Sequence, residues 1–142
     1  MKVLRIHTLK KGWADRDHVM LHAVFQLLVD YVEGEKPGEI LNWNRDVERK
    51  RAWREIRSLH RWWKETRPGR KSPLFEKGLK TPPRCQRKAP GKKLMKLFHY
   101  DKIEYADYHS ALRRHWKLVR KWDAEDQRNL HRLVDIRQFL WT

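Results

Sequence analysis

Residues 67–98 form a Pro- and Gly-rich basic segment that a long helix cannot cross. The segment contains five prolines and three glycines, and these residues interrupt helical hydrogen bonding or favour irregular backbone. It also contains eleven Lys and Arg against one acid, Glu76, and therefore carries +10 of the net charge of +16. The pattern predicts an extended, partly mobile basic crossover inside a single domain of residues 1–142.

Two amphipathic helices are predicted before this segment, over residues 15–33 and 45–66. The first is apolar on two sides, which is typical of a helix that is central in its domain or shared with a partner. The second has one narrow apolar stripe at helical spacing. The apolar residues are Phe25, Val29 and Val32 with Met20, Val24, Leu27 and Tyr31 in the first helix, and Ala52, Ile56, Leu59 and Trp63 in the second.

Two further helices are predicted after the segment, over residues 102–121 and 124–141. Asp123 is the predicted N-cap of the last helix, with Asp126 three residues on as a short version of a capping box. The connection is so short that the two must form an antiparallel hairpin or one long helix. Their predicted core positions are Tyr105, Tyr108, Leu112, Trp116 and Val119, then Leu130, Leu133, Val134 and Trp141.

These elements predict an all-α fold. Four amphipathic helices with one long basic crossover loop favour a four-helix bundle or an orthogonal helical array. Strand-like alternation occurs only near the N-terminus, over residues 3–9.

The composition favours a protein of the cytosol. Cys85 is the single cysteine and cannot form an internal disulfide, the first residues lack the long apolar run of a signal peptide, and no apolar stretch is long enough to span a bilayer. We therefore expect no membrane contact.

The basic surfaces predict a polyanion, most readily DNA or RNA, as partner. Regular ridges of Lys and Arg lie opposite the core stripes of the second and third helices, and the crossover could lie along a phosphate backbone. Nothing in the spacing specifies base reading. The predicted nucleic-acid-binding residues are Lys50, Arg54, Arg57, Arg61, Lys64, Arg70, Lys71, Arg84, Arg87, Lys88, Lys92, Lys93, Arg113, Arg114, Lys117 and Lys121.

Eight tryptophans are unusual in 142 residues. Trp can stack on nucleobases, although most of these residues are expected in the core or between helices. Trp and Arg are also favoured in protein–protein interfaces, so a protein partner stays open.

Two histidine pairs are the weaker candidates for chemistry. His18 and His22 lie one helical turn apart, and so do His131 and Asp135, so each pair could contact one ion. A packed, hydrogen-bonded role is the more ordinary interpretation of histidines on an apolar face. No motif requires a cofactor or an enzyme.

Both ends of the chain resemble small, uncharacterised proteins of tailed bacteriophages. The similar segments are Gly12-Trp13-Ala14-Asp15-Arg16-Asp17, residues 20–33 (MLHAVFQLLVDYVE), and residues 132–142 (RLVDIRQFLWT), and the resemblance also covers the Trp62-Trp63 region. The resemblance implies a phage protein that acts in the cytoplasm of a bacterial host, and it implies no activity or site residue. The chain differs from several of these proteins in being strongly basic.

The sequence thus predicts a small basic phage protein that binds nucleic acid or another polyanion through phosphate contacts, without strong sequence specificity. The alternative is a protein–protein interaction module, such as a host-factor inhibitor or a minor virion component. A metal-dependent enzyme using the His and Asp groups is a lesser alternative.

Overall fold

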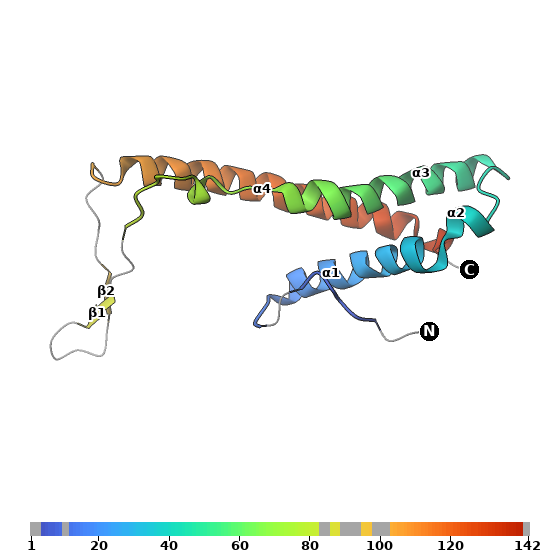
Figure 1. Cartoon of the computed structure of the whole chain (residues 1–142), viewed down its shortest axis with the longest axis horizontal. Helices are drawn as coiled ribbons and strands as arrows, with labels where there is room; N and C mark the ends of the chain where they lie inside the picture. The colour runs from blue at the N-terminus through green and yellow to red at the C-terminus, as the bar shows by residue number, and fades with distance from the viewer. Residues whose placement is uncertain (1–3, 10–11, 83–85, 89–94, 98–102, 141–142) are drawn as a thin grey trace. The chain divides into compact units, whose positions relative to one another are not determined.

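The computed structural model describes residues 4–9, 12–82, 86–88, 95–97 and 103–140, and confirms the all-α prediction. Figure 1 shows the elements along the chain. The α-helices are α1 (Arg16–Val29), α2 (Pro37–Ile40), α3 (Val47–Arg61) and α4 (Ala106–Asp135), and the strands of one small antiparallel hairpin are β1 (Gln86–Lys88) and β2 (Met95–Leu97). A bundle or an orthogonal array stays a prediction.

The contacts divide the chain into two compact units. Unit 1 comprises Met1–Arg70 with Asp123–Thr142, and unit 2 comprises Lys71–Trp122. Unit 1 holds 19 Lys and Arg against 14 Asp and Glu, whereas unit 2 holds 15 against four. Most of the excess charge therefore belongs to unit 2.

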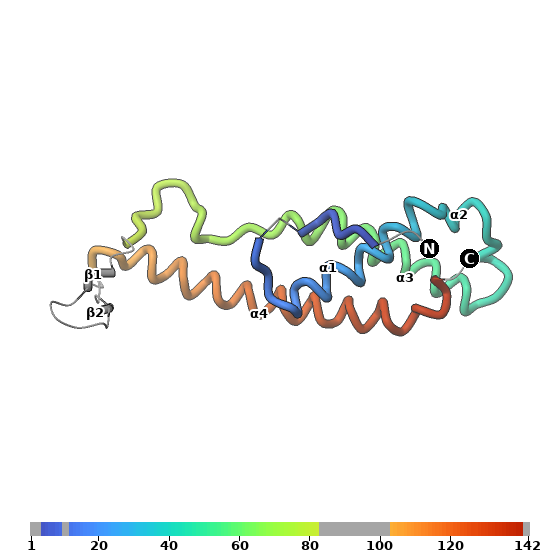
Figure 2. Tube along the Cα trace, turned by 90° about the horizontal axis from the view of Figure 1, so that it is seen from below, coloured from blue at the N-terminus to red at the C-terminus, as the bar shows by residue number. Residues whose placement is uncertain are grey.

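The core of unit 1 lies where α1, α3 and the C-terminal half of α4 run side by side (Figure 2). The predicted stripe of α3 is confirmed, because all four of its residues are buried. Phe25 of α1 stacks on Trp63 with ring centroids 4.5 Å apart, and Trp62 packs at 5.3 Å from the same phenyl ring. Aromatic packing thus joins α1 to the end of α3.

Both helices of this core continue into wider, π-helical turns. The turn Trp62–Thr66 follows α3, and both of its adjacent indoles are buried. The turn Asp30–Glu35 follows α1 and ends at Lys36, which takes the left-handed conformation (φ 50°) although it is not a glycine. The helical run of α1 therefore continues through Gly34 and ends at Glu35.

Helix α2 is held by tryptophans. Trp43 donates from Nε1 to the carbonyl oxygen of Pro37 at 2.9 Å, and its ring stacks on Trp53 of α3 at 4.9 Å. Gly38 leaves the space that the Trp53 ring occupies, because a Cβ there would lie 2.8 Å from that ring. These contacts fix α2 against the start of α3.

The third and fourth predicted helices are one continuous helix, α4. Asp123 lies inside α4, so the prediction that it caps a new helix is wrong. Asp126 serves no capping box either. Its carboxylate accepts hydrogen bonds from Arg67 (Nη2, 3.0 Å) and Arg70 (Nη2, 2.7 Å), and Glu125 accepts a further one from Arg70 at 2.7 Å.

This Asp126 network is largely shielded from water. The side chains of Asp126, Arg67 and Arg70 are 15%, 18% and 15% exposed. Burial alone would raise the pKa of Asp126, but hydrogen bonds from Arg70 and Arg67 outweigh burial and lower the pKa below its ordinary value. The Arg67 guanidinium also lies 4.7 Å over the Trp63 ring, which adds a cation–π contact.

Unit 2 contains the first half of α4 and the segment that precedes it in the chain. A 3₁₀ turn, Pro73–Phe75, begins at Ser72, whose hydroxyl accepts from the Leu74 N–H at 3.1 Å and lies 2.9 Å from His115 Nδ1. Tyr105 and Ala111 are buried. Trp116, a predicted core residue, is instead 52% exposed, so that prediction is wrong.

The strand-like alternation near the N-terminus does not produce a strand among the described residues there. Within the described part of residues 3–9 there is no strand, and the β1–β2 hairpin lies in the basic crossover, with Arg87 paired to Lys96. No helix among the described residues is long and apolar enough to cross a membrane.

Asp126→Asn should destabilise unit 1 by about 2–3 kcal/mol, because it leaves the shielded guanidinium of Arg67 without a carboxylate and that of Arg70 with Glu125 alone. Urea unfolding followed by circular dichroism and Trp fluorescence measures the change. Asp123→Asn is the matched control on the same helix, where the side chain is exposed, and should change stability by less than about 0.5 kcal/mol. Equal effects of the two substitutions would contradict the role given to the network.

Candidate nucleic-acid interface

The predicted basic ridge of α3 faces solvent. Its residues Lys50, Arg54, Arg57, Arg61 and Lys64 are all exposed. They lie opposite the buried stripe, so the helix backbone that carries them is anchored by the core on its other side. Asp46 caps α3 through its carboxylate, which accepts from the Arg49 N–H at 2.7 Å, and thereby fixes where the ridge begins.

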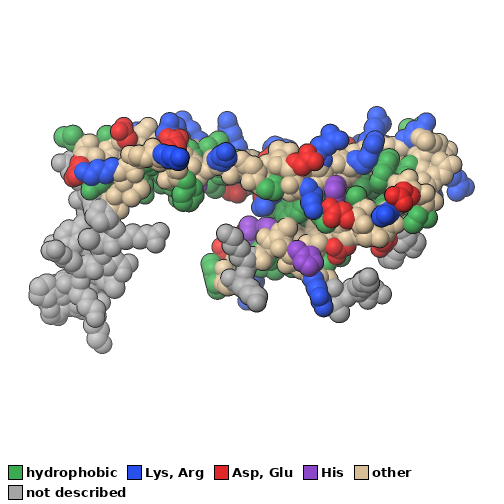
Figure 3. All heavy atoms as spheres, in the orientation of Figure 1, with side chains coloured by type: hydrophobic (Ala, Val, Ile, Leu, Met, Phe, Trp, Pro, Cys, Tyr) green, Lys and Arg blue, Asp and Glu red, His purple; other side chains and the backbone are tan. Residues whose placement is uncertain are grey.

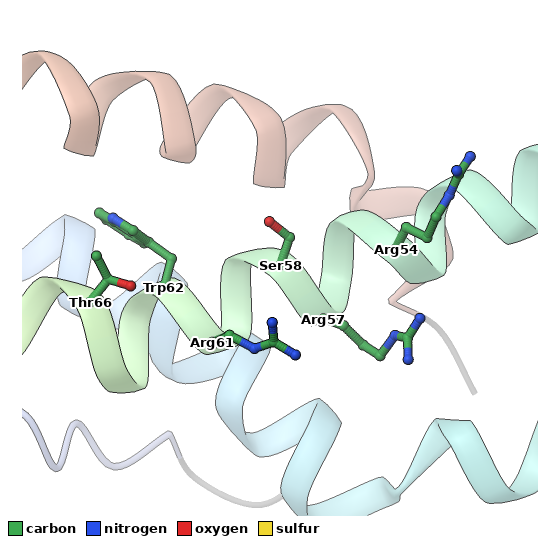
Figure 4. A pocket seen from close by; sticks show the side chains of 6 residues that line it. All are labelled: Arg54, Arg57, Ser58, Arg61, Trp62 and Thr66. Atoms are coloured by element: carbon green, nitrogen blue, oxygen red, sulfur yellow. The ribbon is translucent and has the colours of Figure 1, made fainter.

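An open groove of about 410 Å³ lies along this ridge, and we call it the α3 arginine groove. Figure 4 shows that its side chains arise from consecutive turns of one helical run, with Arg57 and Arg61 extending in the same direction. Its lining residues are Arg54, Arg57, Ser58, Arg61, Trp62 and Thr66. Three guanidinium groups and two hydroxyls are donors of the kind that bind phosphate oxygens.

Glu55, which is next to the groove residue Arg54 in the chain, is paired with a cation of another helix. Glu55 accepts from Arg132 of α4 at 2.8 Å, and Arg132 also donates to the Ser58 hydroxyl oxygen at 3.1 Å. The Ser58 hydroxyl proton therefore stays available to another acceptor. Within the described part of the chain, Arg54 and Arg61 take part in no ion pair, so their charge is not neutralised.

Two other ridge residues have partners. Lys64 pairs with Glu33 at 3.0 Å, and His60 lies 3.0 Å from the same carboxylate. The hydrogen bond from Lys64 lowers the pKa of Glu33, while burial acts in the opposite direction. Arg57 lies 5.6 Å over the Trp53 ring, which positions its guanidinium without neutralising it.

The predicted site residues at the end of this helical run differ from each other. Arg70 belongs to the Asp126 network, so a phosphate would compete with two carboxylates for it. Lys71 is exposed. The binding role of both residues stays a prediction.

The second predicted ridge, on α4 in unit 2, is also exposed. It comprises Arg113, Arg114, Lys117, Arg120 and Lys121. Arg114 pairs with Glu76 at 3.4 Å, and both side chains are more than half exposed, so this pair is weak. Figure 3 shows Lys and Arg side chains spread along the long helices, with fewer acids among them.

The other five predicted residues of the crossover follow Lys71 in the chain. Arg84, Lys92 and Lys93 fall outside the described residues, and of Arg87 and Lys88 the structure gives only their place in β1. Their role stays a prediction.

The histidine candidates are in different surroundings. The His18 and His22 rings pack together with centroids 4.4 Å apart, and His22 Nδ1 lies 2.6 Å from the Thr8 hydroxyl. His131 is exposed and bonds to Gln127 at 2.9 Å. In the described part of the chain, no three His, Cys, Asp or Glu side chains are grouped as a metal site would need.

His22 is a buried, neutral histidine. Its residue is 5% exposed, and its ring packs edge-on against Trp63 at 4.9 Å. Burial first, and then the charges of Arg67 and His18, lower the pKa of His22 from 6.5 to about 4 against the opposing charge of Asp126. The ring is therefore a packing group at neutral pH.

His22 should make the free energy of unfolding decrease as the pH falls. The unfolded chain binds a proton at His22 near pH 6.5, but the folded chain binds it only near pH 4. The free energy of unfolding therefore has its full value above pH 6.5 and falls by about 3 kcal/mol as the pH drops to 4. Urea titrations across this range measure the slope. His22→Gln should remove most of it, whereas His131→Gln, at an exposed histidine, should leave it unchanged. A wild-type protein of constant stability over this range would contradict the assignment.

Three residues of the α3 arginine groove were not predicted as site residues: Ser58, Trp62 and Thr66. Ser58 lies four residues after Arg54 and one after Arg57, so helical spacing alone could have placed its hydroxyl on the basic face. Nothing in the sequence marked Trp62 as a groove residue, because an apolar side chain next to Trp63 suited the core.

No protein-family model matches the chain, and neither a curated protein nor a solved structure matches it.

Proposed function

We propose that the chain is a binding protein, and not an enzyme, that holds nucleic acid through phosphate contacts at the α3 arginine groove without strong sequence specificity. The observation that carries this proposal is a groove with three guanidinium groups beside two hydroxyls, in which the neighbouring Glu55 is already paired with Arg132. Arginine suits phosphate because its planar fork can donate two parallel hydrogen bonds.

The charge distribution supports a long polyanion over a small anion. Unit 1 has the exposed cation Lys50 on α3 besides the groove, and unit 2 separately has exposed cations on α4, among them Arg113 and Lys117. A polymer of phosphates can contact several such cations at once and release its counterions, which favours binding at low salt. DNA and RNA share this chemistry, and the cytoplasm of a bacterial host, where a phage protein would act, contains both.

Reversing the three groove arginines should abolish most of the binding. Arg54→Glu, Arg57→Glu and Arg61→Glu together should lower the affinity for a mixed-sequence oligonucleotide at least roughly tenfold, and lower the slope of log affinity against log salt by up to about three. Fluorescence anisotropy across a salt series measures both quantities.

The matched control carries the same charge change outside the groove. Arg16, Arg45 and Arg128 are exposed residues of unit 1, and their reversal to Glu should weaken binding far less. Equal losses for both triple variants would show that net charge alone matters and would overturn the groove. Failure of the wild-type protein to bind at low salt, or binding indifferent to salt, would overturn the whole proposal.

A host or phage protein is the second candidate partner, favoured by exposed apolar side chains at α1. Met20 and Leu27 are 53% and 49% exposed, and Trp13, just before the helix, is 88% exposed. A pull-down from nuclease-treated lysate separates the two candidates. A stoichiometric partner that Met20→Glu and Leu27→Glu abolish would support this candidate, and partners that vanish after nuclease treatment would support nucleic acid.

A further inference from the structure

Trp116 is the exposed aromatic residue of α4 in unit 2 that has cations on both sides. Its side chain is 52% exposed, although indoles are costly to leave in water. Arg113 lies three residues before it and Arg120 four residues after it, so both project within one turn of the indole on the same side of the helix. Both arginines are exposed.

These arginines are not committed to the fold. Within the described part of the chain, neither Arg113 nor Arg120 takes part in an ion pair. By contrast, Arg114, on another side of α4, reaches Glu76. The surface around Trp116 therefore offers one flat ring between two uncompensated guanidinium groups.

The adjacent ring of His115 does not cover the indole face. The two rings are tilted by 58° with centroids 5.4 Å apart, and His115 Nδ1 is held toward Ser72 by the 2.9 Å hydrogen bond. This bond helps to hold the α4 backbone next to Trp116 against the 72–76 segment.

We infer that Trp116 is a stacking platform for an unpaired nucleobase, and that Arg113 and Arg120 hold the phosphates on either side of that base. The inference rests on the proposed function and deepens it, because it names single-stranded nucleic acid as the preferred ligand. A base can lie flat on an indole only when it is not stacked within a duplex, whereas phosphates are present in either form. The platform therefore discriminates by strand state and not by sequence.

The test separates bases from phosphates with three ligands: oligothymidylate, an abasic oligonucleotide of the same length, and a duplex. The wild-type protein should bind oligothymidylate best. Trp116→Ala should weaken that binding roughly tenfold, and should leave the affinities for the abasic strand and the duplex within about twofold, because the phosphate contacts remain. Oligouridylate should behave like oligothymidylate.

Two variants keep the test specific. Trp116→Phe retains a ring and should keep most of the preference, while Trp116→Leu retains apolar bulk without a ring and should lose it. Phe75→Ala is the matched control, since Phe75 is an exposed aromatic of the same unit at 88% but is followed by an acid, Glu76. It should change no affinity by more than about twofold.

The outcomes distinguish this inference from the proposed function. If the wild-type protein binds all three ligands equally, or if Trp116→Leu behaves like the wild type, the platform is overturned while binding at the α3 arginine groove stands. Equal losses for the abasic strand and oligothymidylate in Trp116→Ala would also overturn it. If the wild-type protein binds none of the ligands at low salt, the proposed function fails and the inference fails with it.

Discussion

The carboxylate of Asp126 is the interaction on which the geometry of unit 1 depends most. It draws two guanidinium groups, from Arg67 and Arg70, onto α4 at the end of the helical run that continues α3. Both cations also lie over tryptophan rings of the preceding turn, at 4.7 and 5.7 Å. A shielded charge of this kind is tolerable only while its partners stay in place, so the network fixes both the end of α3 and its distance from α4.

The network also shows why arginines of one chain can have opposite roles. Arg67, Arg70 and Arg132 each meet a carboxylate within hydrogen-bonding distance. The groove arginines Arg54 and Arg61 meet none among the described residues. The fold thus pairs Glu55, Glu125 and Asp126 with other arginines of unit 1 and leaves Arg54 and Arg61 of the α3 ridge uncompensated, which makes a strongly basic surface compatible with a packed helical core.

Periodic patterns were sufficient for the parts of the fold that depend on neighbouring residues in the sequence. The stripe through Ile56 and Leu59 and the exposed ridge opposite it follow from helical spacing, and Pro68 with Gly69 correctly marks the end of the helical run. The sequence also showed that α1 is apolar on two sides. The second of these sides is partly exposed in the structure, at Met20 and Leu27.

The errors concern partners that are distant in the sequence. An Asp before an amphipathic stretch looks like a cap, and nothing local reveals that Asp126 will meet an arginine 59 residues away. Trp116 has the spacing of a core residue, but a stripe is buried only where another element covers it, and unit 2 has few apolar elements. The arginines of the groove could be predicted from helical spacing. Trp62 could not be predicted as a groove residue, because its burial depends on the turn that follows α3.

That turn, between Trp62 and Thr66, determines where the helical run can lose a residue without turning its later side chains away from their partners. Its wider π-helical winding accommodates one more residue than an α-helical turn would. Loss of a single residue there would return the turn to α-helical hydrogen bonding and leave the residues downstream nearly in phase, whereas loss of a residue from α3 itself would rotate everything downstream by about 100°. Arg67 and Arg70 would then face away from Asp126. Evolution can therefore exchange many surface residues of α3 more easily than it can shorten α3 by one.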